Sequence, residues 1–317
     1  MNRKLPEITA DCFPTPHLAL RGTSDDTRVR AFAAEQAHAA RAVLPAIASA
    51  LALPSTGHGI QMLTLAYDTV VQWRRAVAAA SDDARYGDTG RPIASRYAAT
   101  LDEDGPNYDR VGEVGRSRAG ARWNTATGQW TGGTDTPATR TLAAYGRAVR
   151  RRFAVQAPDS EVLPNIVTLP ISWGQVRGNA LVRGQAARDV AAQLAGRLAD
   201  RRGVVQVETT GDLLYLVTAD DQARRVMFHE AMHVLAAAYR GDRSARWAAW
   251  WSAAYLLYQA PKFKKGSDAT NRVFLAAVGA ALLDQAPVIP HDLDLRCMVL
   301  GQSAVTVAMP LLCEVAA

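Results

Sequence analysis

Apolar residues recur every three or four positions over much of the chain, which is the pattern of helices with one buried face. In the first 80 residues this pattern predicts a helical hairpin, whose second helix runs over residues 60–80 with Arg74 and Arg75 on its outer side. Pro45 is expected to bend or end the first helix. The same period predicts later helices over residues 139–153, 185–202, 221–240, 244–259 and 268–283.

Runs typical of strands are fewer and shorter. Residues 166–171 predict a short strand, and because Pro170 cannot donate a backbone hydrogen bond, the proline is expected at the edge of a sheet or at the end of the strand. The β-prone runs 204–207 and 213–217 flank a turn-forming segment and predict a β-hairpin. Residues 122–130 predict a second, shorter hairpin.

Together these elements predict a helix-rich α+β fold in two parts. The first part, residues 1–157, is expected to be mostly helical, with a long glycine-rich loop over residues 104–137. The second part, residues 158–317, opens in a turn-rich segment and is expected to combine the small sheet with several helices.

Composition narrows the class of protein. Hydrophobic residues make up 49% of the chain and charged residues 21%, as in ordinary globular proteins. The three cysteines are an odd number without a CxxC pair, so the sequence favours a reducing, cytoplasmic setting over a disulfide framework. The N-terminus has no apolar signal segment, and the longest apolar stretches fall well short of the ~20 residues of a membrane span. We therefore expect neither export nor membrane insertion.

Positive charge is carried almost entirely by arginine. The net charge is +6, and only four of the 36 basic residues are lysines. Arginines alternate with aromatic residues between Tyr108 and Trp130, and a second group lies at residues 147–152. These groups are typical of a solvated loop and helix end, or alternatively of contacts with single-stranded nucleic acid.

The sharpest chemical signal is the pentad His229-Glu230-Ala231-Met232-His233 inside the helix predicted over residues 221–240. Because an α-helix turns once in about 3.6 residues, His229 and His233 lie one turn apart on one face and can share a Zn²⁺ ion. Glu230 projects beside them and can take a proton from a metal-bound water.

This HExxH pattern resembles that of the zincin metallopeptidases, over residues 166–259. The resemblance implies a zincin-like second half, in which a small sheet lies beside the active-site helix. It also implies that His229 and His233 are zinc ligands and that Glu230 is the general base. The strand at 213–217 would then align a peptide substrate.

Catalytic zinc ordinarily has three protein ligands, and the sequence leaves the third one open. Tyr239 stands where metzincins continue with a histidine, and Trp250 stands where gluzincins place a glutamate on the next helix. Asp268 is the leading candidate, and His291 is its rival. Alternatively, His291 or Tyr239 could stabilise the oxyanion.

The sequence therefore predicts a Zn²⁺-dependent hydrolase, in the first place a peptidase acting on a protein or peptide substrate. A second hypothesis is a nucleic-acid-interacting protein of a mobile element or regulatory system, in which the arginine-rich first half binds and the zincin-like half is auxiliary. A third is a metal-free zincin-like scaffold for protein contacts.

Overall fold

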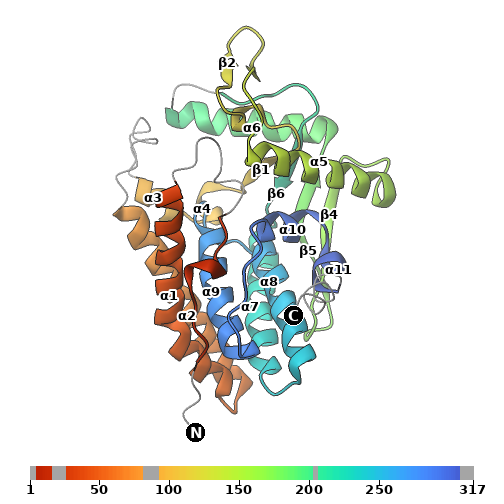
Figure 1. Cartoon of the computed structure of the whole chain (residues 1–317). Helices are drawn as coiled ribbons and strands as arrows, with labels where there is room; N and C mark the ends of the chain where they lie inside the picture. The colour runs from red at the N-terminus through yellow and green to blue at the C-terminus, as the bar shows by residue number, and fades with distance from the viewer. Residues whose placement is uncertain (1–4, 16–25, 81–92, 203–205, 308–317) are drawn as a thin grey trace.

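The computed structural model describes residues 5–15, 26–80, 93–202 and 206–307. A bundle of long helices occupies one end of the molecule, and a small sheet with covering helices and a protruding hairpin occupies the other (Figure 1). The helices of the bundle are α1 (Asp26–Ala52), α2 (Thr56–Ala79), α7 (Asp221–Ala238), α8 (Arg243–Gln259) and α9 (Ser267–Leu283).

The other end is built around two antiparallel sheets. Helices α5 (Pro137–Gln156) and α6 (Gly184–Arg202) lie beside them. The strands are β1 (Tyr108–Val111), β2 (Arg122–Asn124), β3 (Gln129–Thr131), β4 (Val162–Thr168), β5 (Gln175–Val182) and β6 (Leu214–Val217). The short helices are α3 (Ile93–Ala98), α4 (Leu101–Asp104), α10 (Leu293–Val299) and α11 (Gln302–Thr306), with 3-10 turns η1 (Ala10–Cys12) and η4 (Gly115–Ser117).

Helices α7 and α8 form a hairpin with a capping aspartate at the start of each helix. Asp220 accepts a hydrogen bond from the backbone N–H of Ala223 at 2.9 Å, and Asp242 accepts one from Ala245 at 2.8 Å. Both caps satisfy backbone donors that a helix start leaves free. The predicted helices at these positions, and the one at α9, are therefore confirmed to within a few residues.

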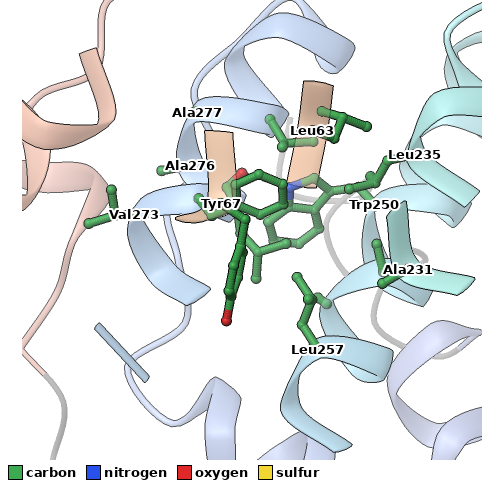
Figure 2. Packing of buried hydrophobic residues seen from close by; sticks show 14 of the residues in the cluster. Leu63, Tyr67, Ala231, Leu235, Trp250, Leu257, Val273, Ala276 and Ala277 are labelled. Atoms are coloured by element: carbon green, nitrogen blue, oxygen red, sulfur yellow. The ribbon is translucent and has the colours of Figure 1, made fainter. Parts of the chain in front are cut away.

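The main hydrophobic core lies between these helices and α1 and α2. Every residue of α9 from Thr270 to Leu283 is buried. Trp250 of α8 donates its indole N–H to the Leu275 carbonyl at 2.9 Å, and its ring lies beside Ala231 and Leu235 of α7 (Figure 2). Trp250 is therefore a core residue.

The main sheet has the strand order β1-β6-β5-β4. Strand β6 pairs with β1 on one side, where Arg110 is opposite Tyr215, and with β5 on the other, where Leu181 is opposite Leu216. An interior strand has no free edge for a substrate backbone. The expectation that residues 213–217 align a peptide is therefore wrong.

The predicted strands met different outcomes. The hairpin at 122–130 is confirmed, with Trp123 opposite Trp130 across β2 and β3. The edge strand is confirmed as β4, although it begins four residues earlier than predicted. Gln206 and Val207 are not in a strand, so no hairpin forms there with β6; Val204 and Val205 lie outside the described residues.

The glycine-rich segment 104–137 is less irregular than predicted, because it contains β1, η4 and the β2–β3 hairpin. Strand β1 belongs to the first predicted part but pairs with β6 of the second. Helices α1 and α2 likewise pack against α9 and α7. The main sheet and the hydrophobic core thus each contain residues from both sides of the predicted boundary between residues 157 and 158. Among the described helices, none is long and apolar enough to cross a membrane.

Candidate functional site

The two histidines of the pentad lie on the outer face of α7. His229 is exposed and His233 is half-buried, while Ala231 and Met232 between them are buried in the core. The imidazole ring centroids are 6.2 Å apart, with the rings inclined at 69°. The helix therefore brings the two predicted ligands side by side, as their spacing predicts.

Glu230 points away from solvent, toward the turn between β4 and β5. The exposed fraction of Glu230 is only 1%. Oε1 accepts hydrogen bonds from the backbone N–H groups of Ile171 at 2.6 Å and Ser172 at 3.1 Å, and Oε2 accepts one from the Ser172 hydroxyl at 2.6 Å. Burial alone would raise the pKa of Glu230, but these bonds and the nearby His233 lower it below its ordinary value.

The candidate third ligands have other partners. Asp268 accepts a hydrogen bond from the Tyr258 hydroxyl at 2.8 Å and pairs with Arg272 at 3.0 Å at the start of α9. His291 lies 3.4 Å from the carboxylate of Asp292, measured from Nδ1 to Oδ1. Over the described ranges, no three histidine, cysteine, aspartate or glutamate side chains are placed together to hold a metal ion.

The positions of these side chains can be compared with the ligands that the expected Zn²⁺ ion would need. The described residues supply two imidazoles on one face and a carboxylate with both oxygens engaged, whereas catalytic zinc needs three protein ligands and an open position. Tyr239, the other candidate for oxyanion stabilisation, lies under the guanidinium of Arg246, 5.6 Å from ring centroid to Cζ. Within the described ranges, the residues do not fit a catalytic zinc site.

A concave region lies at the end of the molecule opposite the helical bundle, between α5, the β2–β3 hairpin and the segment before β6. It is a groove of about 760 Å³. Its basic residues are Arg110, Arg118, Arg140, Arg147 and Arg150. Its acidic residues are Glu113, Asp135, Glu208 and Asp212.

Helix α5 forms the basic wall of this groove. It carries five arginines and no acidic residue. Its buried face, which includes Leu142, Val149 and Phe153, packs with the sheet. Arg152 turns inward and donates to the side-chain oxygen of Asn165 at 2.8 Å. The other four arginines of α5 are exposed.

Ion pairs neutralise only part of the groove. Arg118 pairs with Asp135 at 3.2 Å, and Arg150 pairs with Asp212. Arg110 is 3.6 Å from Glu208.

In contrast, Arg140 and Arg147 have no ion-pair partner among the residues that the structure describes. Two of the groove's five arginines are therefore not neutralised by an ion pair with a described residue.

The hairpin contributes an aromatic side chain to the groove. Trp130 lines it and packs edge-to-face on Trp123, with ring centroids 5.7 Å apart. Its backbone N–H donates to Glu208 at 3.2 Å. The Trp130 side chain lies so close to Gly115 that a Cβ there would clash with it. Glu208 and Gly115 therefore contact the backbone and Cβ of Trp130, and Trp123 contacts its indole.

A smaller cavity of about 230 Å³ adjoins the groove and shares Arg110 and Val114 with it. Asp268 and Asp294 both line this cavity. Burial, and then the negative charge of Asp268, raises the pKa of Asp294 to about 7. One carboxyl of the pair is therefore partly protonated at neutral pH.

Sequence patterns had singled out Arg110, Arg118 and residues 147–152, but not Arg140 or the acidic residues of the groove. The signal that identifies Arg140 is the absence of any acidic residue over the whole of α5. Glu208 and Asp212 lie about 60 or more residues from the arginines they face, so no local pattern reveals them.

No protein-family model matches the chain, and no curated protein matches its sequence. The zincin resemblance therefore depends on the pentad and the residues around it. The role of the groove is argued from its geometry and charge.

Proposed function

We propose that this protein binds single-stranded nucleic acid in the groove beside α5. The observation that carries the proposal is the pair Arg140 and Arg147, which face the groove without an ion-pair partner among the described residues. They are seven residues apart on one helix, or about 10 Å at 1.5 Å per residue. Phosphates of one extended strand can contact both.

The rest of the groove fits the same ligand. Arginine binds phosphate oxygens through two parallel N–H groups and stacks on bases. Five arginines and four carboxylates line the groove, and the two arginines without an ion-pair partner among the described residues are the ones that suit phosphate groups. Trp130 places an indole in the lining of the groove, on which an unpaired base can stack. A base within a duplex cannot use that surface, and for this reason the proposal names a single strand.

The test is a titration of a fluorescein-labelled oligonucleotide of mixed sequence, followed by fluorescence polarisation at several salt concentrations. Wild-type affinity is expected to fall steeply as salt rises, because bound phosphates release counterions. The double variant Arg140→Gln with Arg147→Gln should bind at least about tenfold more weakly at low salt. It should also reduce the slope of log K against log salt by about 1.4, since each contact with a single strand contributes about 0.7.

The matched control is Arg177→Gln. Arg177 is an exposed arginine on β5, outside the groove, and it has no ion-pair partner among the described residues. Removing it changes the net charge but should change affinity by less than about twofold, provided that contacts and not overall charge drive binding. Equal losses for groove and control variants, or no salt-dependent binding by the wild type, would contradict the proposal.

The proposal does not extend to zinc-dependent peptide hydrolysis. His229 and His233 lie side by side, which favours that prediction, but Asp268 and His291 have partners of their own. Hydrolase activity stays a prediction of the sequence. Elemental analysis and a peptidase assay of the purified protein test it directly, and neither outcome bears on the groove.

A further inference from the structure

The segment that Glu230 contacts is the connection between β4 and β5. Within it the N–H of Leu169 donates to the Gly174 carbonyl at 2.9 Å, and the N–H of Trp173 donates to the Leu169 carbonyl at 3.2 Å. Trp173 has a left-handed backbone, with φ of 51°, and is 90% exposed. Closing the chain in this way leaves the N–H groups of Ile171 and Ser172 directed at α7.

The Glu230 carboxylate satisfies both of these donors. One oxygen accepts both N–H groups, and the other accepts the Ser172 hydroxyl. Successive backbone N–H groups that converge on one anion are a recurring protein arrangement, and hydrogen bonds to a charged group are the stronger ones. Leaving such donors buried without a partner is costly.

The same contacts make Glu230 a poor general base. A general base must come within hydrogen-bond reach of the water it activates. Glu230 is almost fully buried, and its two oxygens already accept three hydrogen bonds, so no oxygen of the carboxylate is free to reach such a water.

We infer that Glu230 is a structural clamp that joins α7 to the β4–β5 turn, and that the HExxH pentad of this chain is not a catalytic zinc site. His229 and His233 then remain as an outer pair of ring nitrogens with no third protein ligand among the described residues. The inference is independent of nucleic-acid binding in the groove.

Hydrogen exchange of the full-length protein, followed by mass spectrometry, tests the clamp. Glu230→Gln should speed exchange of the peptide covering residues 169–174 by about tenfold or more, because an amide accepts these hydrogen bonds less strongly than a carboxylate. Exchange in α9 should change much less. Ser172→Ala removes only one of the three bonds, so it should give a smaller change at the same peptide even if Glu230→Gln folds poorly.

Glu161→Gln is the matched control. Glu161 also accepts two backbone N–H groups, from Gln185 and Ala186, each at 2.8 Å, at the start of α6. Its substitution should speed exchange at residues 185–186 and leave residues 169–174 unchanged.

Zinc titration by isothermal calorimetry supplies the second measurement. Wild type and Glu230→Gln should both bind zinc no more tightly than a two-imidazole site does, in the micromolar range or weaker. The inference is overturned if exchange at residues 169–174 is the same in both proteins. It is also overturned if the wild type holds one zinc ion per chain tightly and loses it on His233→Ala.

Discussion

Asp268 and Asp294 line the same small cavity, but within the described part of the chain only Asp268 has an arginine at hydrogen-bond distance. Arg272 and the Tyr258 hydroxyl both contact the Asp268 carboxylate. Asp294 experiences burial and the charge of Asp268, and its pKa rises to about 7. The folded-state pKa of Asp294 therefore differs from that of an unfolded aspartate.

This difference gives the free energy of unfolding a definite pH dependence. Asp294 binds a proton in the folded state up to about pH 7, whereas an unfolded aspartate releases it near pH 4. Because the folded state holds more protons over this range, the group contributes stability below about pH 4, and that stability is lost as pH rises toward 7.

Asp294→Asn removes this charge, so the variant should be more stable than the wild type at pH 8, by on the order of 1–3 kcal/mol. The difference should shrink toward pH 4. Urea unfolding at several pH values, followed by circular dichroism, measures it. Asp159→Asn, at an exposed position, is the control. A neutral or destabilising effect of Asp294→Asn at pH 8 would refute the assignment of the raised pKa.

At the scale of elements, helix α9 is closely enclosed by its neighbours. It is buried on all sides from Thr270 onward, and Gly279 faces the ring of Pro287 and the indole of Trp250. A Cβ at position 279 would clash with the proline ring. Gly196 of α6 is also inside a helix, but it has no neighbouring atom within 4 Å of such a Cβ.

The two glycines should respond to alanine with opposite signs. Gly279→Ala is expected to lower the free energy of unfolding by about 1–3 kcal/mol, because the packed neighbours must move. Gly196→Ala should raise it by about 0.5–1 kcal/mol, because alanine restricts the unfolded chain and favours the helix. Denaturant unfolding of both variants checks the pair. A stabilising Gly279→Ala would show that packing around α9 is looser than described, and a destabilising Gly196→Ala would contradict the prediction for α6.

Helical periodicity predicted α7, α8 and α9 well, because each has a long apolar pattern, and α7 and α8 also begin at a capping aspartate. Strand β1 was missed: its four residues Tyr108–Val111 are too short to show alternation and lie in a glycine-rich segment. The run at 213–217 was recognised as a strand, but its neighbours are set by pairing over long distances, which no local pattern encodes.

The same limit applies to the pentad. Spacing alone placed His229 and His233 side by side on one face, and the structure has them so. The partners of Glu230 lie 58 and 59 residues away, on a turn that only the folded chain brings to α7. A motif describes which side chains share a helix face, but it does not describe what packs against that face.

At the scale of the whole molecule, the two halves of the chain are interlocked. Strand β1 closes one side of β6, and α1 and α2 cover α9 and α7. Removing residues 1–157 would leave one edge of β6 unpaired and expose apolar faces of the bundle. Both losses oppose folding of the remainder.

A fragment of residues 158–317 should therefore fail to fold by itself. We expect its thermal transition by circular dichroism to be broad or absent, and its binding of a hydrophobic dye to exceed that of the full chain. The full-length protein, expressed and purified in the same way, is the control. A sharp transition near the full-length midpoint would show that the second half is an independent domain.

The position of β6 also determines when the main sheet can be completed during synthesis on the ribosome. Its two neighbours both precede it in the chain, and β1 lies about 100 residues upstream of its partner. Until residue 217 has emerged, β1 has no strand to pair with, and β5 is paired with β4 on one side only. The glycine-rich stretch and α5 therefore leave the exit tunnel well before the strand that anchors them.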